Sequence, residues 1–181
     1  MKKVLILSGS PRKGGNSDIL CDQFMKGALE QGNEVEKIFI AEKNIAPCSG
    51  CYFCRKSGGR CAVNDDMGEI LQKIIDCDVL VLSSPVYFYS MSAQLKMVID
   101  RTVARWTEIA NKDLYYITTA AESDDDTMDG TLAAMRGFAK CIDGYYEQGV
   151  LYGKGVSEKG EVVNRPELMQ IAYEMGLSVH D

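Results

Sequence analysis

Short apolar runs, each ended by turn residues, alternate with amphipathic segments of helix length along almost the whole chain. The runs VLIL (4–7) and DVLVLS (78–83) are apolar enough for strands that are buried on both faces of a parallel sheet. The alternation predicts strands over 4–7, 34–41, 78–83, 114–118 and 149–152, and helices over 17–31, 66–76, 92–106, 127–140 and 165–175. We therefore expect an α/β fold in which helices cover both faces of a five-stranded parallel sheet.

The length of 181 residues suits one domain, 1–181, because no repeat or linker interrupts this alternation. The net charge of −6 does not favour a nucleic-acid or membrane partner, which would need clustered Lys and Arg. No apolar run approaches the ~20 residues of a membrane span. The apolar run that follows the opening Met-Lys-Lys is also too short for a signal peptide. We expect a cytoplasmic protein.

Ligands of such sheets bind beyond the carboxyl ends of the strands, where the strand order reverses. The loop after the first strand, SGSPRKGGNS (8–17), offers hydroxyl, amide and guanidinium groups just ahead of a helix N-terminus. It matches neither of the glycine-rich patterns G-x-x-x-x-G-K-[ST] and G-x-G-x-x-G. Its density of oxyanion donors favours a single phosphate monoester over an ordinary strand-to-helix turn.

The segment after the third strand, SSPVYFYSMSAQLKMVIDR (83–101), opens with aromatic residues in a non-helical stretch fixed by Pro85. A planar ring needs apolar faces and backbone groups at its edge, and Tyr87, Phe88 and Tyr89 with their backbone can supply both. Packing in the core or at a subunit interface is the alternative interpretation of these side chains.

Four cysteines, Cys48, Cys51, Cys54 and Cys61, fall within fourteen positions, too densely for core packing. Successive two-residue spacings favour an iron–sulfur cubane, whereas structural zinc usually divides its ligands between two separated knuckles. Free thiols at a subunit interface are the third interpretation. The odd total of seven cysteines does not indicate a disulfide framework.

Three motifs in this order, GSPRKGGNS, PCSGCYFCRKSGGRCAVNDDM and PVYFYSMSAQLKMVIDR, resemble those of the flavodoxin-like NAD(P)H-dependent FMN reductases. Within that superfamily the chain is most similar to the iron–sulfur flavoproteins, from Met1 to about Arg105. The resemblance implies a flavodoxin-like three-layer sandwich with strand order 2-1-3-4-5, and 48–61 as an insert after the second strand. It also implies bound FMN, NADH or NADPH as co-substrate, and a homodimer or homotetramer.

The resemblance further assigns site residues. For the FMN phosphate it implies Ser10, Arg12, Asn16 and Ser17 as ligands, and Gly15 of the same loop as a further cofactor-binding residue. For the isoalloxazine ring it implies Pro85, Val86, Tyr87, Phe88, Tyr89 and Ser90, approached from the fourth strand by Thr119 and Ala120. For a [4Fe-4S] cluster it implies Cys48, Cys51, Cys54 and Cys61. No acid–base residue is assigned, because a flavin carries the chemistry itself.

The expected function is hydride transfer from a nicotinamide nucleotide to FMN, followed by electron transfer to a flavin, quinone or protein acceptor. An alternative is an electron carrier, either an iron–sulfur flavoprotein or a flavodoxin-type protein, without NAD(P)H activity of its own. The acidic pI of about 4.9 suits such a carrier. A non-enzymatic metal or redox sensor on the same frame is a further alternative.

Overall fold

Five parallel strands form one sheet in the order β2-β1-β3-β4-β5 in the computed structural model of the chain, which describes residues 1–124 and 126–180. The strands are β1 (Lys3–Ser8), β2 (Glu34–Phe39), β3 (Val79–Pro85), β4 (Asp113–Thr119) and β5 (Tyr146–Gly153). The predicted strand order and the α/β class are confirmed.

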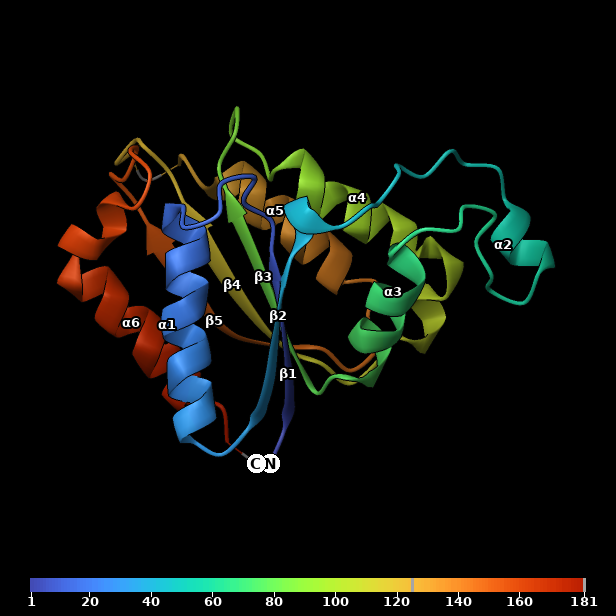
Figure 1. Cartoon of the computed structure of the whole chain (residues 1–181), viewed down its shortest axis with the longest axis horizontal. Helices are drawn as coiled ribbons and strands as arrows, with labels where there is room; N and C mark the ends of the chain where they lie inside the picture. The colour runs from blue at the N-terminus through green and yellow to red at the C-terminus, as the bar shows by residue number, and fades with distance from the viewer. Residues whose placement is uncertain (125, 181) are drawn as a thin grey trace.

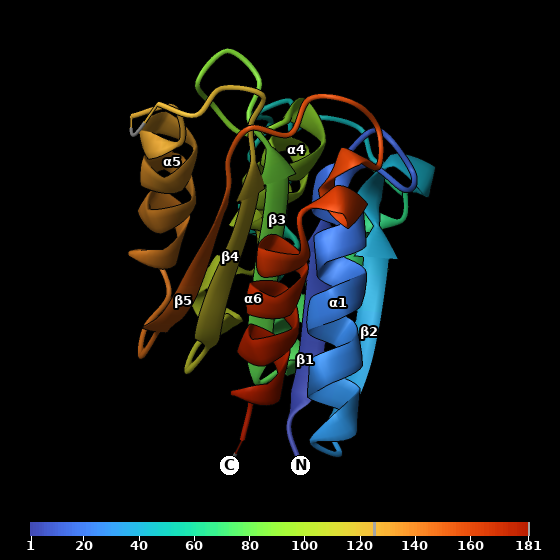
Figure 2. The same cartoon turned by 90° about the vertical axis from the view of Figure 1, so that its left-hand side faces the viewer.

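Helices cover both faces of this sheet, which makes the three layers seen in Figures 1 and 2. On one face lie α1 (Asn16–Glu30) and α6 (Pro166–Leu177), and on the other lie α3 (Met67–Asp76), α4 (Ala93–Arg101) and α5 (Asp129–Ala139). The helix expected over 92–106 ends at Arg101 and continues as two 3₁₀ turns, η2 (Thr102–Ala104) and η3 (Trp106–Glu108). Two further 3₁₀ turns are η1 (Ile40–Glu42) and η4 (Glu161–Asn164).

The central strands account for two separate hydrophobic cores. Side chains alternate between the faces of a strand, so Leu5 and Leu7 of β1 pack in the core under α3, α4 and α5. Val4 and Ile6 pack in the core under α1 and α6. This explains why the run VLIL has no polar position.

Helices α1 and α6 approach each other closely because two glycines face each other. A Cβ atom at Gly27 would lie 2.2 Å from the carbonyl oxygen of Tyr173, and one at Gly176 would lie 2.1 Å from that of Phe24. Any larger residue would force the helices apart.

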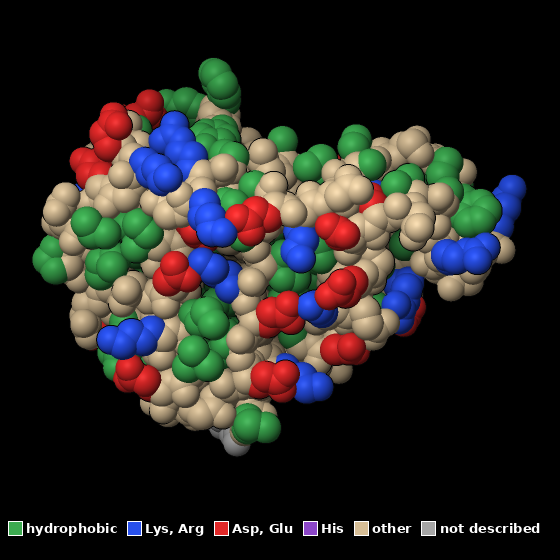
Figure 3. Space-filling model, in the orientation of Figure 1, with side chains coloured by type: hydrophobic (Ala, Val, Ile, Leu, Met, Phe, Trp, Pro, Cys, Tyr) green, Lys and Arg blue, Asp and Glu red, His purple; other side chains and the backbone are tan. Residues whose placement is uncertain are grey.

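The cysteine-rich segment leaves the end of β2 through η1 and projects from one end of the molecule with the short helix α2 (Phe53–Lys56) (Figure 1). On the face seen in Figure 3, basic and acidic side chains are interspersed, and hydrophobic side chains stand out where the loop after β3 projects. No helix in the described residues is both long and apolar enough to cross a membrane.

Candidate functional site

The loops that follow β1, β3, β4 and β5 meet around a cavity of about 240 Å³ at the carboxyl ends of the strands. The lining residues are Ser10, Arg12, Gly15, Asn16, Ser17, Pro85, Val86, Tyr87, Thr119, Ala120, Ala121, Val156, Ser157 and Lys159. The structure thus brings the predicted phosphate loop, the start of the aromatic segment and the predicted residues after β4 together. Phe88, Tyr89 and Ser90 are not part of the lining.

The phosphate loop is a tight turn that ends at the start of α1. The Ser10 hydroxyl donates to the Arg12 carbonyl and accepts from the Arg12 amide, both at 3.1 Å, and the Gly15 amide donates to the same carbonyl at 2.8 Å. In the described part of the chain no side chain caps α1, whose N-cap is Gly15. Because first-turn amides lack partners within the helix, this end is suited to an anion.

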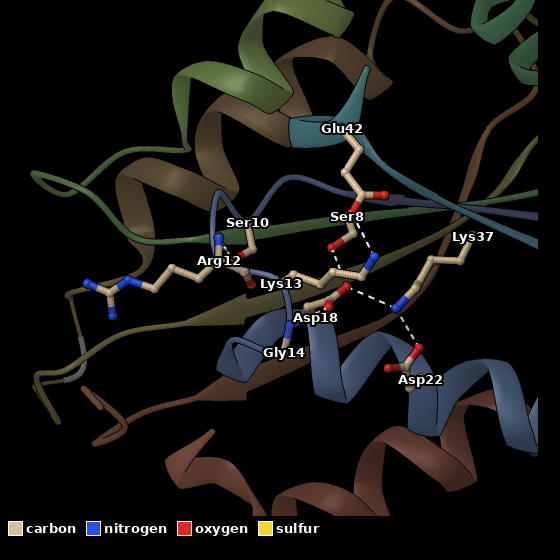
Figure 4. Close-up of polar contacts among 9 residues, drawn as sticks. All are labelled: Ser8, Ser10, Arg12, Lys13, Gly14, Asp18, Asp22, Lys37 and Glu42. Atoms are coloured by element: carbon tan, nitrogen blue, oxygen red, sulfur yellow. Dashed lines mark hydrogen bonds and ion pairs between the residues drawn. The ribbon is translucent and has the colours of Figure 1, made fainter. Parts of the chain in front are cut away.

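The side chains of Arg12 and Asn16, both predicted phosphate ligands, have partners in the loop after β5. The Arg12 side chain points away from the loop (Figure 4), and its exposed guanidinium lies 3.5 Å from the Ser157 carbonyl. The Asn16 amide donates to the Glu158 carbonyl at 2.9 Å and accepts from the Val162 amide at 3.1 Å. Its side chain therefore anchors the loop after β5 to α1.

That loop, with Val156, Ser157 and Lys159 at the cavity, was not among the predicted site residues. A signal was present in the sequence, since a fifth parallel strand must end at the same edge of the sheet as the others. Its loop, KGVSEKG (154–160), has a single hydroxyl residue, Ser157, against three serines in the loop after β1.

The aromatic segment forms a two-residue hairpin turn. Tyr87 and Ser90 exchange backbone hydrogen bonds of 2.9 and 3.1 Å. Phe88 and Tyr89 between them have φ angles of 48° and 59°, a conformation that usually selects glycine or asparagine and costs other residues roughly 1–2 kcal/mol each. Phe88 is fully exposed at the tip, whereas Tyr87 lines the cavity.

The hairpin lies near the acidic β4–α5 connection. The charge of the Glu122 carboxylate, together with a hydrogen bond to it, raises the pKa of the Tyr89 phenol. The Tyr89 phenol thus lies within the electrostatic reach of the β4–α5 connection.

All four clustered cysteines line a second cavity, of about 350 Å³, which they share with Arg101. The pKa of the Cys51 thiol is lowered by the backbone amide of Phe53 at the start of α2 and by the Ser49 hydroxyl. Four cysteine thiols are the type of ligand that binds an iron–sulfur cluster. However, no three Cys, His, Asp or Glu side chains converge as a metal-binding group anywhere in residues 1–124 and 126–180.

A buried ion pair closes the base of the cysteine-rich segment. Arg101, at the end of α4, is 3 % exposed and donates to both carboxylate oxygens of Asp65 at 2.8 and 2.9 Å, and to the Ala46 carbonyl at 2.6 Å. The Ala46 amide in turn donates to Asp65 at 2.9 Å. Burial would raise the pKa of Asp65, but Arg101 and the backbone amides hold it below its ordinary value. Both ends of the segment are thus fixed to α4.

Residues 2–134 of the chain match the model of a protein family described as NADPH-dependent FMN reductase. The chain belongs to this family. In this FMN reductase family member the match runs from β1 into the first half of α5, and so includes three of the four loops of the 240 Å³ cavity.

Its curated relatives include an iron-sulfur flavoprotein of Methanocaldococcus jannaschii, 45 % identical over 100 residues, which are 55 % of this chain and 51 % of the relative. An iron-sulfur flavoprotein of Methanosarcina thermophila is 39 % identical over 101 residues, or 56 % of this chain and 52 % of the relative. The matched region thus spans about half the length of these relatives.

Among solved structures, an NAD(P)H:quinone oxidoreductase of Methanothermobacter marburgensis superposes with a TM-score of 0.70 at 18 % identity, covering 99 % of both chains. At this identity the likeness shows the flavodoxin-like fold.

Proposed function

We propose that the 240 Å³ cavity binds FMN and that the protein is an oxidoreductase that takes hydride from NADH or NADPH. The observation that carries the proposal is the convergence of an uncapped helix N-terminus and an aromatic hairpin on one cavity. The first suits a phosphate and the second suits a planar ring. Membership of the NADPH-dependent FMN reductase family supports the same ligand.

The residues present fit FMN in the following way. The backbone amides at the start of α1 and the Ser17 hydroxyl would hold the phosphate, and the Ser10 hydroxyl would join them by turning its proton from the Arg12 carbonyl. The segment Pro85, Val86 and Tyr87 would lie along the ring, and Thr119 and Ala120 would meet it from β4. When bound, FMN would supply the capacity to accept a hydride and to pass on its two electrons, singly or as a pair, with release of the proton.

The chain's own part in the reaction is to bind, orient and exclude water. Tyr87, at the base of the hairpin, lines one side of the cavity, and the loop anchored by Asn16 lines another. We assign no general acid or base. Electrons would pass to a free flavin, a quinone or a protein.

Steady-state oxidation of NADH and NADPH by FMN-reconstituted protein tests the proposal. We expect oxidation that requires FMN and is accelerated by added flavin or quinone. Stoichiometric FMN binding without oxidation of either nucleotide would overturn the reductase assignment and favour an electron carrier. Failure to bind FMN at all would overturn the cofactor site and favour a redox or metal sensor.

A second candidate is an electron-transfer iron–sulfur flavoprotein, favoured by the four thiols that line one cavity. Binding a cluster would require Cys48, Cys51, Cys54 and Cys61 to draw together from their present positions. Iron and sulfide analysis of anaerobically purified protein tests this candidate. About four of each per chain would support a [4Fe-4S] cluster, and zinc or no metal would overturn it.

We further propose a homodimer or homotetramer. Large apolar side chains are exposed on and beside the cysteine-rich segment, at Tyr52, Phe53, Val103 and Trp106. Light scattering coupled to size exclusion measures the mass directly, and a monomer at micromolar concentration would contradict the proposal.

A further inference from the structure

A buried carboxylate beneath the phosphate loop joins three elements of the fold. Asp18, in the first turn of α1, is 3 % exposed. It accepts hydrogen bonds of 2.9 Å each from the Ser8 hydroxyl, the Gly14 amide and the Lys37 ammonium group. Figure 4 shows these groups approaching from the end of β1, from the loop and from β2. Asp18 therefore orders the loop through the Gly14 amide.

The same bonds place a negative charge directly beside a loop that we assign to a phosphate. Burial would raise the pKa of Asp18, but the Gly14 amide and Lys37 hold it below its ordinary value, so the carboxyl is ionised at neutral pH. Like charges repel strongly where burial limits the screening by water. Without a compensating cation, the residue that orders the loop would also weaken its anion binding.

Lys37 is placed to be that cation. Its side chain is 18 % exposed and forms ion pairs with Asp18 and with Asp22, whose own side chain is 53 % exposed. Burial would lower the pKa of Lys37, but the two carboxylates raise it, so the ammonium group stays charged. Lys13, the lysine within the loop, pairs instead with Glu42 at the surface.

We propose that Lys37 determines how strongly this site favours a phosphorylated flavin, by offsetting the charge of Asp18. Lys37 does not line the cavity, so it acts as a positioning residue through Asp18 and not by touching the ligand. The inference rests on the proposed FMN site.

The test compares the dissociation constants of FMN and riboflavin, measured by quenching of flavin fluorescence on the apoprotein. Riboflavin lacks the phosphate and isolates the ring contribution. We expect Lys37→Met to weaken FMN about tenfold, equivalent to ~1.4 kcal/mol, and to change riboflavin less than about twofold. Asp18→Asn keeps an oxygen for the Gly14 amide, so adding it to Lys37→Met should restore FMN binding to within about threefold of wild type.

Lys73→Met is the matched control. This substitution also removes one lysine charge from an ion pair, in this case with Glu36 of β2. The pair lies on the face of the sheet opposite α1, so both dissociation constants should be unchanged. Lys37→Arg keeps the charge and should retain most of the preference for FMN.

Equal weakening of FMN and riboflavin by Lys37→Met, or no rescue in the double variant, would overturn the inference while leaving the FMN site intact. If the wild type bound riboflavin as tightly as FMN, both the phosphate site and this inference would fall.

Discussion

Gly130, in the first turn of α5, lies directly against the carbonyl oxygen of Tyr89. A Cβ atom at position 130 would come 2.1 Å from that oxygen, closer than any non-bonded contact allows. The start of α5 therefore sets the position of the whole aromatic hairpin, although the two residues are far apart in the sequence.

Replacing Gly130 with alanine should displace the hairpin from the cavity. We expect FMN and riboflavin to lose affinity equally, by about 1–3 kcal/mol as in other overpacked sites, because the ring and not the phosphate is affected. Gly137→Ala in the same helix is the matched control, since nothing lies within 4 Å of its added Cβ. A loss confined to FMN would contradict this placement of the hairpin.

Removing the Arg12 side chain should affect only the phosphorylated flavin. Because the guanidinium is exposed and its one hydrogen-bond partner within residues 1–124 and 126–180 is the Ser157 carbonyl, at 3.5 Å, we expect Arg12→Ala to weaken FMN by no more than about 1–2 kcal/mol. Riboflavin affinity, measured in the same titration, should not change. If both ligands weaken together, Arg12 does not bind the phosphate.

The ion pair between Asp65 and Arg101 should contribute strongly to stability. Asp65→Asn leaves the buried Arg101 charge uncompensated, so we expect a loss of about 3 kcal/mol in the free energy of unfolding by urea. Glu108→Gln breaks the exposed pair with Arg105 and should cost less than about 1 kcal/mol. Similar losses of unfolding free energy in the two variants would show that burial of the Asp65–Arg101 pair does not determine its contribution to stability.

The depressed pKa of Asp18 predicts a specific dependence of stability on pH. Its stabilising contribution is complete above the ordinary carboxyl pKa of 3.8 and is lost as the pH falls through the lower value of the folded state. The stability difference between wild type and Asp18→Asn should therefore be constant near neutral pH and shrink below about pH 4. Urea unfolding across that range measures it, and a difference that grows on acidification would contradict the prediction.

Cys54→Ser separates the two proposed cofactors. The cavity with the cysteines and the cavity with the phosphate loop have no lining residue in common. We expect the variant to lose any iron found in anaerobic wild-type protein and to bind FMN unchanged. One-electron acceptors should then be reduced more slowly, with less effect on a two-electron quinone. Iron content unaltered by the substitution would exclude Cys54 as a ligand.

The sequence determined the order and class of the elements because burial leaves a local signature. The centre of a buried strand, such as 79–82 (VLVL), is apolar at every position because helices cover both faces of its sheet. The phosphate loop was equally visible, since its hydroxyls and glycines are adjacent along the chain. Contiguous motifs also made the family resemblance recognisable, and the match over residues 2–134 confirms it.

Only the tertiary structure decided which side chains are available to a ligand, because the hydrogen bonds that engage the others join residues distant in sequence. Asn16 reads as an oxyanion donor in its own loop, yet its amide is bound to Glu158 and Val162 after β5. Lys37 reads as an ordinary strand residue, and only the parallel pairing of β2 with β1 brings it to Asp18. Spacing alone placed the four cysteines together. In the folded chain the four thiols line one cavity but do not converge on a common metal position in the described residues. Spacing along the chain limits how far apart the thiols can lie, but it does not determine where each one points.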